Sequence, residues 1–344
     1  MTQKMQAAVV EIFGTPLVLR EWDVPSPGIG QILVKTEACG VCHTDLHAAR
    51  GDWPIKPTPP FIPGHEGIGR VVGVGLNVTH VREGDRVGIP WLYSACGHCE
   101  YCLGGWETVC PEAQFGGYTK NGAYAEYFLA DPNYVARIPN ALSAVDAAPI
   151  IGAGITTYKG IKETGARPGD WIAIFGVGGL GHLAIQYAKV MGLHVCAIDV
   201  EDARLGHAKR LGADLVFNAK DPDAVDAVRK ETGGGAHGVL ITAPSQSAVR
   251  QGIEMTRKRG TCVLLGLPPG EFPLPLFDVI AACITIRGSF VGTRLDMAEA
   301  LAFAAEGKVK AEIELQPLSA INKVFERLEH GDIASRVVLE FKSA

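Results

Sequence analysis

Four cysteines crowd into one short stretch of the chain, as Cys96-x2-Cys99-x2-Cys102-x7-Cys110. Four thiolates in one loop suit a tetrahedral zinc ion, and four protein ligands leave no position for a substrate. The spacing therefore predicts a structural zinc ion that stabilises a lobe over about residues 91–113. Two disulfides or a loop of free thiols are the alternatives, although disulfides are rare in the cytosol.

A second group of chemically capable residues lies earlier in the chain. Residues 39–47 read CGVCHTDLH, and residues 64–67 read GHEG. Together they supply thiolates, imidazoles, carboxylates and a hydroxyl, which are the parts of an open metal site with a shell of orienting groups. The two segments therefore predict a catalytic metal site.

A glycine-rich loop lies between the apolar run 171–175 and the helix-like segment 182–191. In that context G-x-G-x-x-G predicts dinucleotide binding, because its glycines allow a tight turn, close approach of a pyrophosphate and close packing of the helix. The loop reads Gly176, Val177, Gly178, Gly179, Leu180 and Gly181.

Asp199 ends the next strand-like run after this loop. A carboxylate there can bind both ribose hydroxyls and would repel a 2′-phosphate, so NAD is favoured over NADP. The alternative is a chance glycine turn in which Asp199 caps a helix.

The elements that position these groups change in character along the chain. From residue 5 to about 140, short β-like runs are separated by turns, which predicts an irregular β-rich domain. Residues 142–166 have helical spacing, and beyond them apolar strand-like runs alternate with helix-like segments. That alternation predicts a parallel sheet with helices on both faces. The expected strands are residues 171–175, 194–199, 215–217, 238–242, 261–265 and 285–288.

The tail of the chain has no obvious core of its own. It reads as a helix over 295–306, a short linker, a second helix over 321–330 and a strand over 336–341. We expect this tail to pack back onto the β-rich domain.

Length and composition restrict the class of protein. The chain has 344 residues, of which 47% are hydrophobic, enough to bury a core in each of two domains. Its formal net charge of −5, without a Lys/Arg-rich tract, provides no basic surface for nucleic acid. No apolar run reaches the ~20 residues of a membrane span, and the first residues do not read as a signal peptide. We expect a cytoplasmic protein without nucleic-acid or membrane partners.

The run GVCHTDLH, the GHEG turn, the four-cysteine lobe and GVGGLG occur in this order and spacing in a known family. Over essentially its whole length the chain resembles the zinc-dependent medium-chain alcohol dehydrogenases, and it looks most similar to the bacterial and yeast-type members, which are homotetramers. The resemblance implies an α/β fold with two domains. A GroES-like catalytic domain would comprise residues 1–150 and 290–344, and a Rossmann NAD-binding domain would comprise residues 151–289.

The resemblance also implies roles for the residues of the second group. Cys42 and His65 would be ligands of a catalytic zinc ion, and Glu66 would be an alternative ligand. Asp45 would not bind zinc itself but would orient the imidazole of His65.

The same resemblance implies which residues contact the substrate and which carry its proton away. Thr44 would hydrogen-bond the alcohol oxygen, and His47 would pass the proton through the cofactor ribose to solvent. Trp53 and Trp91 would form a narrow apolar wall for small primary alcohols, although both could be ordinary packing residues.

Further cofactor contacts follow from the resemblance. They are His43 and Arg336 at the phosphates, Arg204 at the adenosine ribose, and Leu265, Gly266, Leu267, Ser289 and Val291 around the nicotinamide.

Gly152 departs from the family pattern. The family usually reads L-C-A-G-V-T at the helix linking the domains, and its cysteine is a zinc ligand, whereas residues 151–156 read IGAGIT. Three interpretations follow. Zinc can still bind through Cys42 and His65, with Glu66 or water filling in; the catalytic zinc can be absent; or the change can be an engineered one.

We therefore predict an NAD-dependent enzyme that oxidises small primary alcohols to aldehydes, and the reverse, with an activity reduced or altered by Gly152. The alternatives are a zinc-free reductase, an NAD-binding scaffold that has lost its catalytic zinc, and a non-catalytic NAD-binding or redox-sensing protein.

Overall fold

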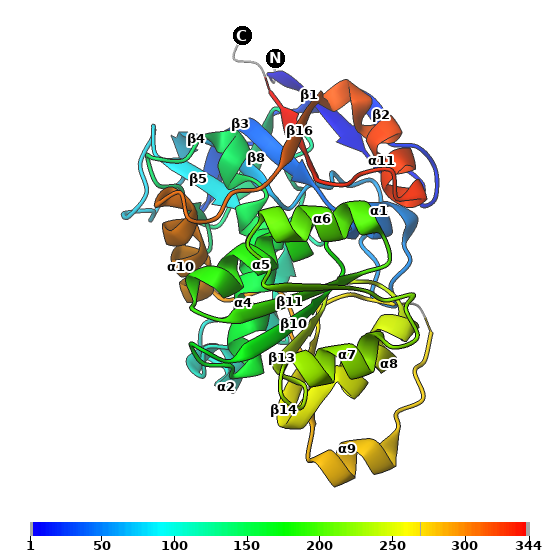
Figure 1. Cartoon of the computed structure of the whole chain (residues 1–344). Coiled ribbons are helices and arrows are strands. Elements are labelled where there is room, and N and C mark those ends of the chain that lie inside the picture. Colours follow the sequence, from blue (N-terminus) through cyan, green and yellow to red (C-terminus); the bar gives the residue numbers. More distant parts are fainter. Residues whose placement is uncertain (1–2, 269, 342–344) are drawn as a thin grey trace. The chain divides into compact units, whose positions relative to one another are not determined.

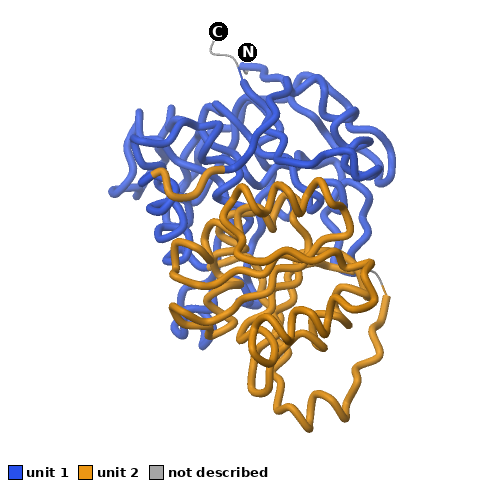
Figure 2. Tube along the Cα trace, in the orientation of Figure 1, with its two compact units in different colours: residues 1–152, 293–306, 311–344 blue, residues 153–292, 307–310 orange. Residues whose placement is uncertain are grey.

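The computed structural model describes residues 3–268 and 270–341. The chain forms two compact units (Figure 2). Unit 1 comprises residues 1–152, 293–306 and 311–344, and unit 2 comprises residues 153–292 and 307–310. The first boundary falls directly after Gly152.

Unit 2 is built on a six-stranded sheet in which every neighbouring pair is parallel. The order is β12-β11-β10-β13-β14-β15, so the first strand in sequence, β10, lies in the middle. This confirms the predicted doubly wound parallel sheet. The strands are β10 (Trp171–Phe175), β11 (His194–Asp199), β12 (Leu215–Asn218), β13 (Ala236–Ile241), β14 (Thr256–Leu264) and β15 (Thr285–Gly288).

Helices cover both faces of this sheet, as Figure 1 shows. On one face, Val249 and Ile253 pack over Phe175, Ile198 and neighbouring strand residues in a fully buried cluster. Burial on both faces explains why these strands read as continuous apolar runs. The helices are α4 (Ile155–Thr164), α5 (Gly181–Val190), α6 (Asp202–Arg210), α7 (Ala224–Glu231), α8 (Gln246–Met255) and α9 (Leu276–Ala282).

Unit 1 is built on an irregular sheet with the strand order β16-β17-β3-β4-β5-β9, in which β8 also pairs with β3. Its pairs are antiparallel except for β16 with β17. Two further sheets pair β1 with β2 and β6 with β7. The strands are β1 (Lys4–Val9), β2 (Val18–Asp23), β3 (Ile32–Val41), β4 (Gly67–Val74), β5 (Arg86–Ile89), β6 (Leu92–Ser94), β7 (Gln114–Phe115), β8 (Tyr127–Ala130), β9 (Ala136–Arg137), β16 (Ile313–Pro317) and β17 (Arg336–Glu340).

The helices of unit 1 are short and connect the strands that carry the site. They are α1 (His43–Arg50), α2 (Glu100–Leu103), α3 (Ala144–Ala147), α10 (Arg294–Ala305) and α11 (Ile321–His330), with 3-10 turns at Glu107–Val109 and Leu318–Ala320. The terminal strand β17 pairs with β3, so the tail completes the sheet of unit 1.

Two expectations about secondary structure are wrong. The helix expected over 142–166 is broken into α3, a π-helical turn at Ile150–Gly154 and α4. Pro149 cannot donate a backbone hydrogen bond, and such π turns occur often at functional sites. The tail also contains a strand, β16, where a linker was expected, because five residues give too weak an alternation to detect.

No helix in the described ranges is long and apolar enough to cross a membrane.

Candidate active site

The central strand β3 positions the first member of the site. β3 ends at Val41, and Cys42 follows with an extended backbone, φ −128° and ψ 156°, immediately before α1. The Cys42 N–H donates to Asp45 Oδ2 at 3.0 Å, which holds the start of the helix in place. The thiol therefore lies at the junction of a buried strand and a capped helix.

Asp45 accepts hydrogen bonds from several directions and is 1% exposed. Its Oδ1 lies 2.8 Å from His65 Nδ1 and accepts from the Gly64 N–H at 3.1 Å. Its Oδ2 also accepts from the Tyr124 hydroxyl at 3.0 Å. Because Asp45 engages Nδ1 of His65, Nε2 of that ring is the nitrogen left for other chemistry.

Cys42 and His65 stabilise each other's charged forms. Burial opposes the thiolate, but a hydrogen bond with His65 and the positive charge of Arg336 lower the pKa of Cys42. Burial also opposes the imidazolium, but the charge of Asp45 and its hydrogen bond raise the pKa of His65 well above its usual value. The pair thus combines a polarised thiol with an oriented imidazole.

Glu66 is fully buried and lies between two glycines. A Cβ built on Gly152 would lie 1.9 Å from Glu66 Oε1, and one built on Gly40 would lie 1.9 Å from Oε2. Real Cβ atoms never approach so closely, so this position of the carboxylate requires glycine on both sides. The space that a side chain at position 152 would need is filled by Glu66.

The donor atoms of Cys42, His65 and Glu66 all lie within 4.8 Å of one another. Zinc binds sulfur at about 2.3 Å and nitrogen or oxygen at about 2.0–2.2 Å, so tetrahedral ligands stand roughly 3.3–3.8 Å apart. A small contraction of this cluster therefore accommodates the ion. One sulfur, one nitrogen and one oxygen donor fit a zinc site with a fourth position open.

Arg336 lies in the same cluster. Its Nη2 is 2.6 Å from Glu66 Oε1 and 2.5 Å from Oε2, and the side chains are 5% and 0% exposed. This residue was expected at the cofactor phosphates, whereas in the structure its contact is with Glu66.

Aromatic rings line the approach to His65. Trp91 is buried and packs edge-on against His65, with ring centroids 5.4 Å apart, and Trp53 is edge-on to Trp91 at 6.0 Å. The structure thus brings both expected tryptophans together. Phe115 and Tyr118 also contact Trp91, at 5.1 and 5.3 Å. Sequence reasoning missed these two because nothing in their spacing marks them.

Thr44 and His47 lie one turn apart on α1, and His43 is exposed at its start. His47 Nδ1 lies 2.8 Å from Asp52 Oδ2, a partner that the sequence did not identify. The His47 ring is also 5.7 Å from that of Trp53. These residues place a hydroxyl and an oriented imidazole on the helix that follows Cys42.

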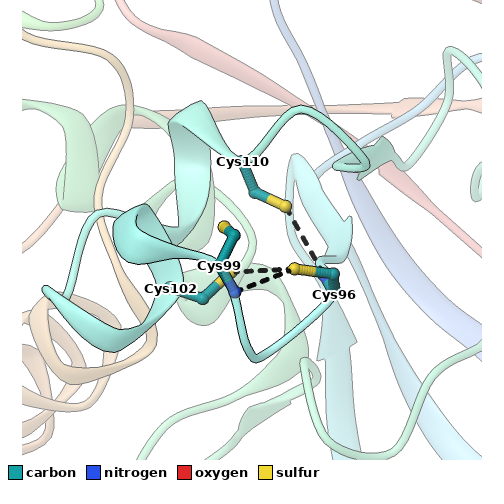
Figure 3. Close-up of side chains that lie close together, drawn as sticks. All are labelled: Cys96, Cys99, Cys102 and Cys110. Atoms are coloured by element: carbon teal, nitrogen blue, oxygen red, sulfur yellow. Dashed lines mark hydrogen bonds between the residues drawn. The ribbon is translucent and has the colours of Figure 1, made fainter.

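The four cysteines of the lobe form a second cluster of donor atoms suited to a metal ion (Figure 3). The sulfurs of Cys96, Cys99, Cys102 and Cys110 lie within 4.8 Å of one another, and all nine cysteines of the chain are free. Two sulfurs, those of Cys96 and Cys102, are 3.9 Å apart. The expected spacing in a tetrahedral zinc–tetrathiolate is about 3.8 Å, so the cluster fits the ion and the disulfide alternative is not formed.

Backbone amides already favour thiolate in this lobe. The Cys99 N–H donates to Cys96 Sγ at 3.3 Å, and the Glu112 N–H donates to Cys110 Sγ at 3.4 Å. The backbone of His98, followed by that of Cys99, lowers the pKa of Cys96 to about 6. His98 itself is exposed.

The glycine-rich loop of unit 2 has the geometry of a phosphate cradle. Gly176 has φ 89°, and a Cβ on Gly181 would lie 1.7 Å from the carbonyl oxygen of Gly176. A Cβ on Gly178 would meet nothing within 4 Å, so the backbone there is open to a ligand. Asp199 Oδ2 accepts from the Val177 N–H at 2.7 Å, which joins the loop to the end of β11. These observations fit a dinucleotide.

The other residues of unit 2 that were expected to contact the cofactor follow the carboxyl ends of its strands. Leu265, Gly266 and Leu267 follow β14, and Ser289 and Val291 follow β15. The Ser289 hydroxyl is buried without a hydrogen-bond partner among residues 3–268 and 270–341, which leaves it available to a ligand. Arg204 Nη1 lies 3.9 Å from Asp199 Oδ2.

Comparison with known proteins places the chain in a family. Residues 28–140 match the family model of the alcohol dehydrogenase GroES-like domain, and residues 179–306 match that of the zinc-binding dehydrogenases. An alcohol dehydrogenase of Moraxella sp. (strain TAE123) is 56% identical over 98% of this chain and 99% of its own length. The chain belongs to the zinc-binding alcohol dehydrogenases. The predicted family, the GroES-like and Rossmann fold class and the oxidoreductase activity are thereby confirmed.

Solved structures of alcohol dehydrogenases and related reductases have the same fold. The alcohol dehydrogenase from the hyperthermophilic archaeon Aeropyrum pernix matches with a TM-score of 0.89 and 34% identity over 98% of this chain and 100% of its own. Acetophenone reductase from Geotrichum candidum, solved in complex with NAD, matches with a TM-score of 0.89 and 30% identity over 99% of this chain and 98% of its own. The chain is an NAD- and zinc-dependent alcohol dehydrogenase, and the comparisons do not favour a non-catalytic scaffold.

Proposed function

We propose that this alcohol dehydrogenase oxidises small primary alcohols with a zinc ion held by Cys42, His65 and Glu66. The observation that carries the proposal is the position of Glu66, whose carboxylate fills the space beside Gly152. The carboxylate supplies the third donor in place of the side chain that glycine lacks. Unit 1 provides catalysis in this proposal, and unit 2 binds the cofactor.

Zinc would lower the pKa of an alcohol hydroxyl by several units, and NAD would accept the hydride. The protein's own groups then move the proton. Thr44 accepts a hydrogen bond from the alcohol hydroxyl, and His47 receives the proton. Because Asp52 engages Nδ1 of His47, Nε2 is free to accept it. His47 is partly exposed, so the proton can pass on to solvent.

Asp45 acts through His65 and touches no substrate. It holds the ring at Nδ1, which leaves Nε2 as the nitrogen that would bind zinc, and its negative charge would offset part of the charge of the ion. Trp53 and Trp91 form the substrate wall, which favours small apolar alcohols because two indole rings narrow the approach.

NAD is the cofactor that the loop of unit 2 suits. The glycine-rich loop around Gly178, before α5, would hold its pyrophosphate, and Asp199 would bind the ribose hydroxyls. The cofactor contacts also proposed are His43, Gly176, Val177, Gly179, Leu180, Gly181, Arg204, Leu265, Gly266, Leu267, Ser289, Val291 and Arg336. Cys96, Cys99, Cys102 and Cys110 would hold the second, structural zinc ion. Nine free cysteines also suit the reducing cytoplasm.

A homotetramer is the assembly that we propose. Strand β15 is at the edge of its sheet, and α9, which precedes it, has no buried residue, with Phe277 81% and Ile280 73% accessible. Apolar exposure beside an open strand edge suits contact with a second copy of the chain. Light scattering should give four chains per particle, and Phe277→Asp should reduce that number; a monomeric parent would contradict the assembly.

Metal content and turnover together test the proposal. The unmodified protein should bind two zinc ions per chain and form NADH from ethanol and benzyl alcohol. Glu66→Gln should bind the catalytic ion more weakly and lose turnover, and Cys42→Ser should retain one ion and lose turnover. One zinc ion and no NADH formation in the unmodified protein would contradict the proposed enzyme.

A further inference from the structure

The guanidinium of Arg336 lies amid the same groups that would bind the metal. One nitrogen, Nη2, donates to both oxygens of Glu66, whose carboxylate lies in the same cluster of donor atoms as Cys42 and His65. A guanidinium that holds both carboxylate oxygens competes with a metal ion that needs one of them as a ligand.

The contact is buried and strong. Glu66 is 0% exposed and Arg336 is 5% exposed, so solvent competes little for either charge. An arginine guanidinium is always protonated, so Arg336 remains a permanent cation in the cluster.

The fit of Arg336 is nevertheless incomplete. Its Nε is buried without a hydrogen-bond partner among residues 3–268 and 270–341. One nitrogen serves both carboxylate oxygens, whereas a paired arginine can use two parallel N–H groups. This arrangement leaves donor capacity unused, so the guanidinium can be displaced more readily than an ideally paired one.

We propose that Arg336 is a built-in competitor of the metal for Glu66. The inference rests on the proposed function, in which Glu66 is a zinc ligand. Zinc can bind Glu66 only in the fraction of molecules where the guanidinium has moved away, and the apparent Kd rises by the inverse of that fraction. Arg336 thus lowers the zinc affinity of the site and provides Glu66 with a counter-ion when zinc leaves.

This competition depends on the absence of a side chain at Gly152. With a side chain at position 152, Glu66 could not occupy its present place, because the Cβ would collide with Oε1. Removal of that side chain puts one carboxylate within reach of both the metal donors and Arg336. The same glycine therefore creates the third ligand and exposes it to a competitor.

Zinc affinity of the catalytic site is the quantity to measure, by competition with a chromophoric chelator. Cys42→Ser gives the blank, since the ions it retains belong to the cysteine lobe. Arg336→Gln should lower the Kd of the catalytic ion at least tenfold, because the competing cation is gone. Arg327→Gln, which removes an arginine paired with Glu314 instead, should leave that Kd unchanged.

The double variant separates competition from simple charge repulsion. In a Glu66→Gln background there is no shared carboxylate, so Arg336→Gln should improve zinc binding much less than in the parent chain. An equal improvement in both backgrounds would overturn the proposal, and so would an unchanged or weaker affinity in Arg336→Gln.

Two further measurements distinguish failure of the Glu66 ligand assignment from failure of the proposed competition. If Glu66→Gln alone leaves the zinc affinity unchanged, the ligand assignment in the proposed function fails. If it weakens zinc and Arg336→Gln does not tighten it, only the competition fails. Should Arg336→Gln unfold on removal of zinc, Arg336→Lys replaces it. Lysine keeps the charge but lacks the planar guanidinium that reaches both oxygens of Glu66, so it should give an intermediate gain, and no gain would overturn the proposal.

Discussion

Glu66 and Gly152 share one volume of the protein interior: a Cβ at position 152 would lie 1.9 Å from Glu66 Oε1 and 2.5 Å from its Cδ. The two residues are therefore coupled. A side chain at 152 and the present position of Glu66 exclude each other, so position 152 decides where the carboxylate can be.

Gly152→Ala tests this coupling without adding a ligand. The methyl group should displace Glu66 from the site and from Arg336, and disruption of a buried ion pair costs about 3–5 kcal/mol. We expect a lower melting temperature and loss of the catalytic zinc ion. Gly206→Ala is the matched control, because a Cβ there meets only one flexible arginine atom at 4.0 Å. In a helix that change should stabilise the protein by up to about 1 kcal/mol; equal behaviour of the two variants would refute the coupling.

Asp45→Asn should weaken zinc binding at the catalytic site by about 10–100-fold, the usual effect of removing a carboxylate that orients a histidine ligand. The amide cannot accept from Gly64, His65, Cys42 and Tyr124 as the carboxylate does. Chelator competition measures the affinity. Tyr124→Phe removes only one of these bonds and should cost much less; equal losses would argue against an orienting role.

Cys99→Ser should remove the structural zinc ion while leaving the catalytic one. Helix α2, which carries Cys102, has no buried residue, so the order of this part of the lobe should depend on the metal. Zinc content should fall by one ion per chain, and proteolysis should cut first within residues 95–112. Cys283→Ser, at an exposed cysteine outside both clusters, should change neither. Unaltered zinc content in Cys99→Ser would contradict the site.

Asp199→Gly should relax the preference for NAD over NADP, because the charge that repels a 2′-phosphate is lost. The ratio of kcat/KM for the two cofactors measures it. Asp199 also accepts from the Val177 N–H, so the variant should bind NAD more weakly as well. An unchanged ratio would contradict the assigned role.

Acid pH should remove the contribution of one ion pair in unit 1. Hydrogen bonds from Arg327, and then from Gln316, lower the pKa of Glu314 to about 2. The unfolded value is about 4.3, so the pair stabilises the folded state above that pH and the effect is lost as pH falls toward 2. Because the pair is partly exposed, Glu314→Gln should cost no more than about 1 kcal/mol at pH 7. Urea titrations should show this difference vanish near pH 2; a difference that grows on acidification would exclude the assignment.

Much of the fold could be predicted because its signals are local. The strands of unit 2 read as apolar runs, and the loop around Gly178 lies directly between one of them and a helix. The cysteine lobe was equally clear, because all four ligands lie within one short stretch. The π-helical turn at residues 150–154 was not predictable, since helical spacing continues on both sides of it.

The contacts that decide the chemistry are long-range and carry no sequence signal. Glu66 and Arg336 are 270 positions apart, and nothing in either segment indicates that they pair. Phe115 and Tyr118 likewise meet Trp91 only through folding. The departure at Gly152 could be identified from the sequence, whereas the position of the Glu66 carboxylate beside it could be found only from the folded structure.

A crystal structure of the zinc-loaded protein, with anomalous diffraction recorded at the zinc edge, tests the central claim most directly. We predict an anomalous peak at the catalytic site bonded to Cys42, His65 and one oxygen of Glu66, at about 2.0–2.2 Å from that oxygen. A fully loaded cysteine lobe with no catalytic peak, or a peak with Glu66 still held by Arg336, would contradict it.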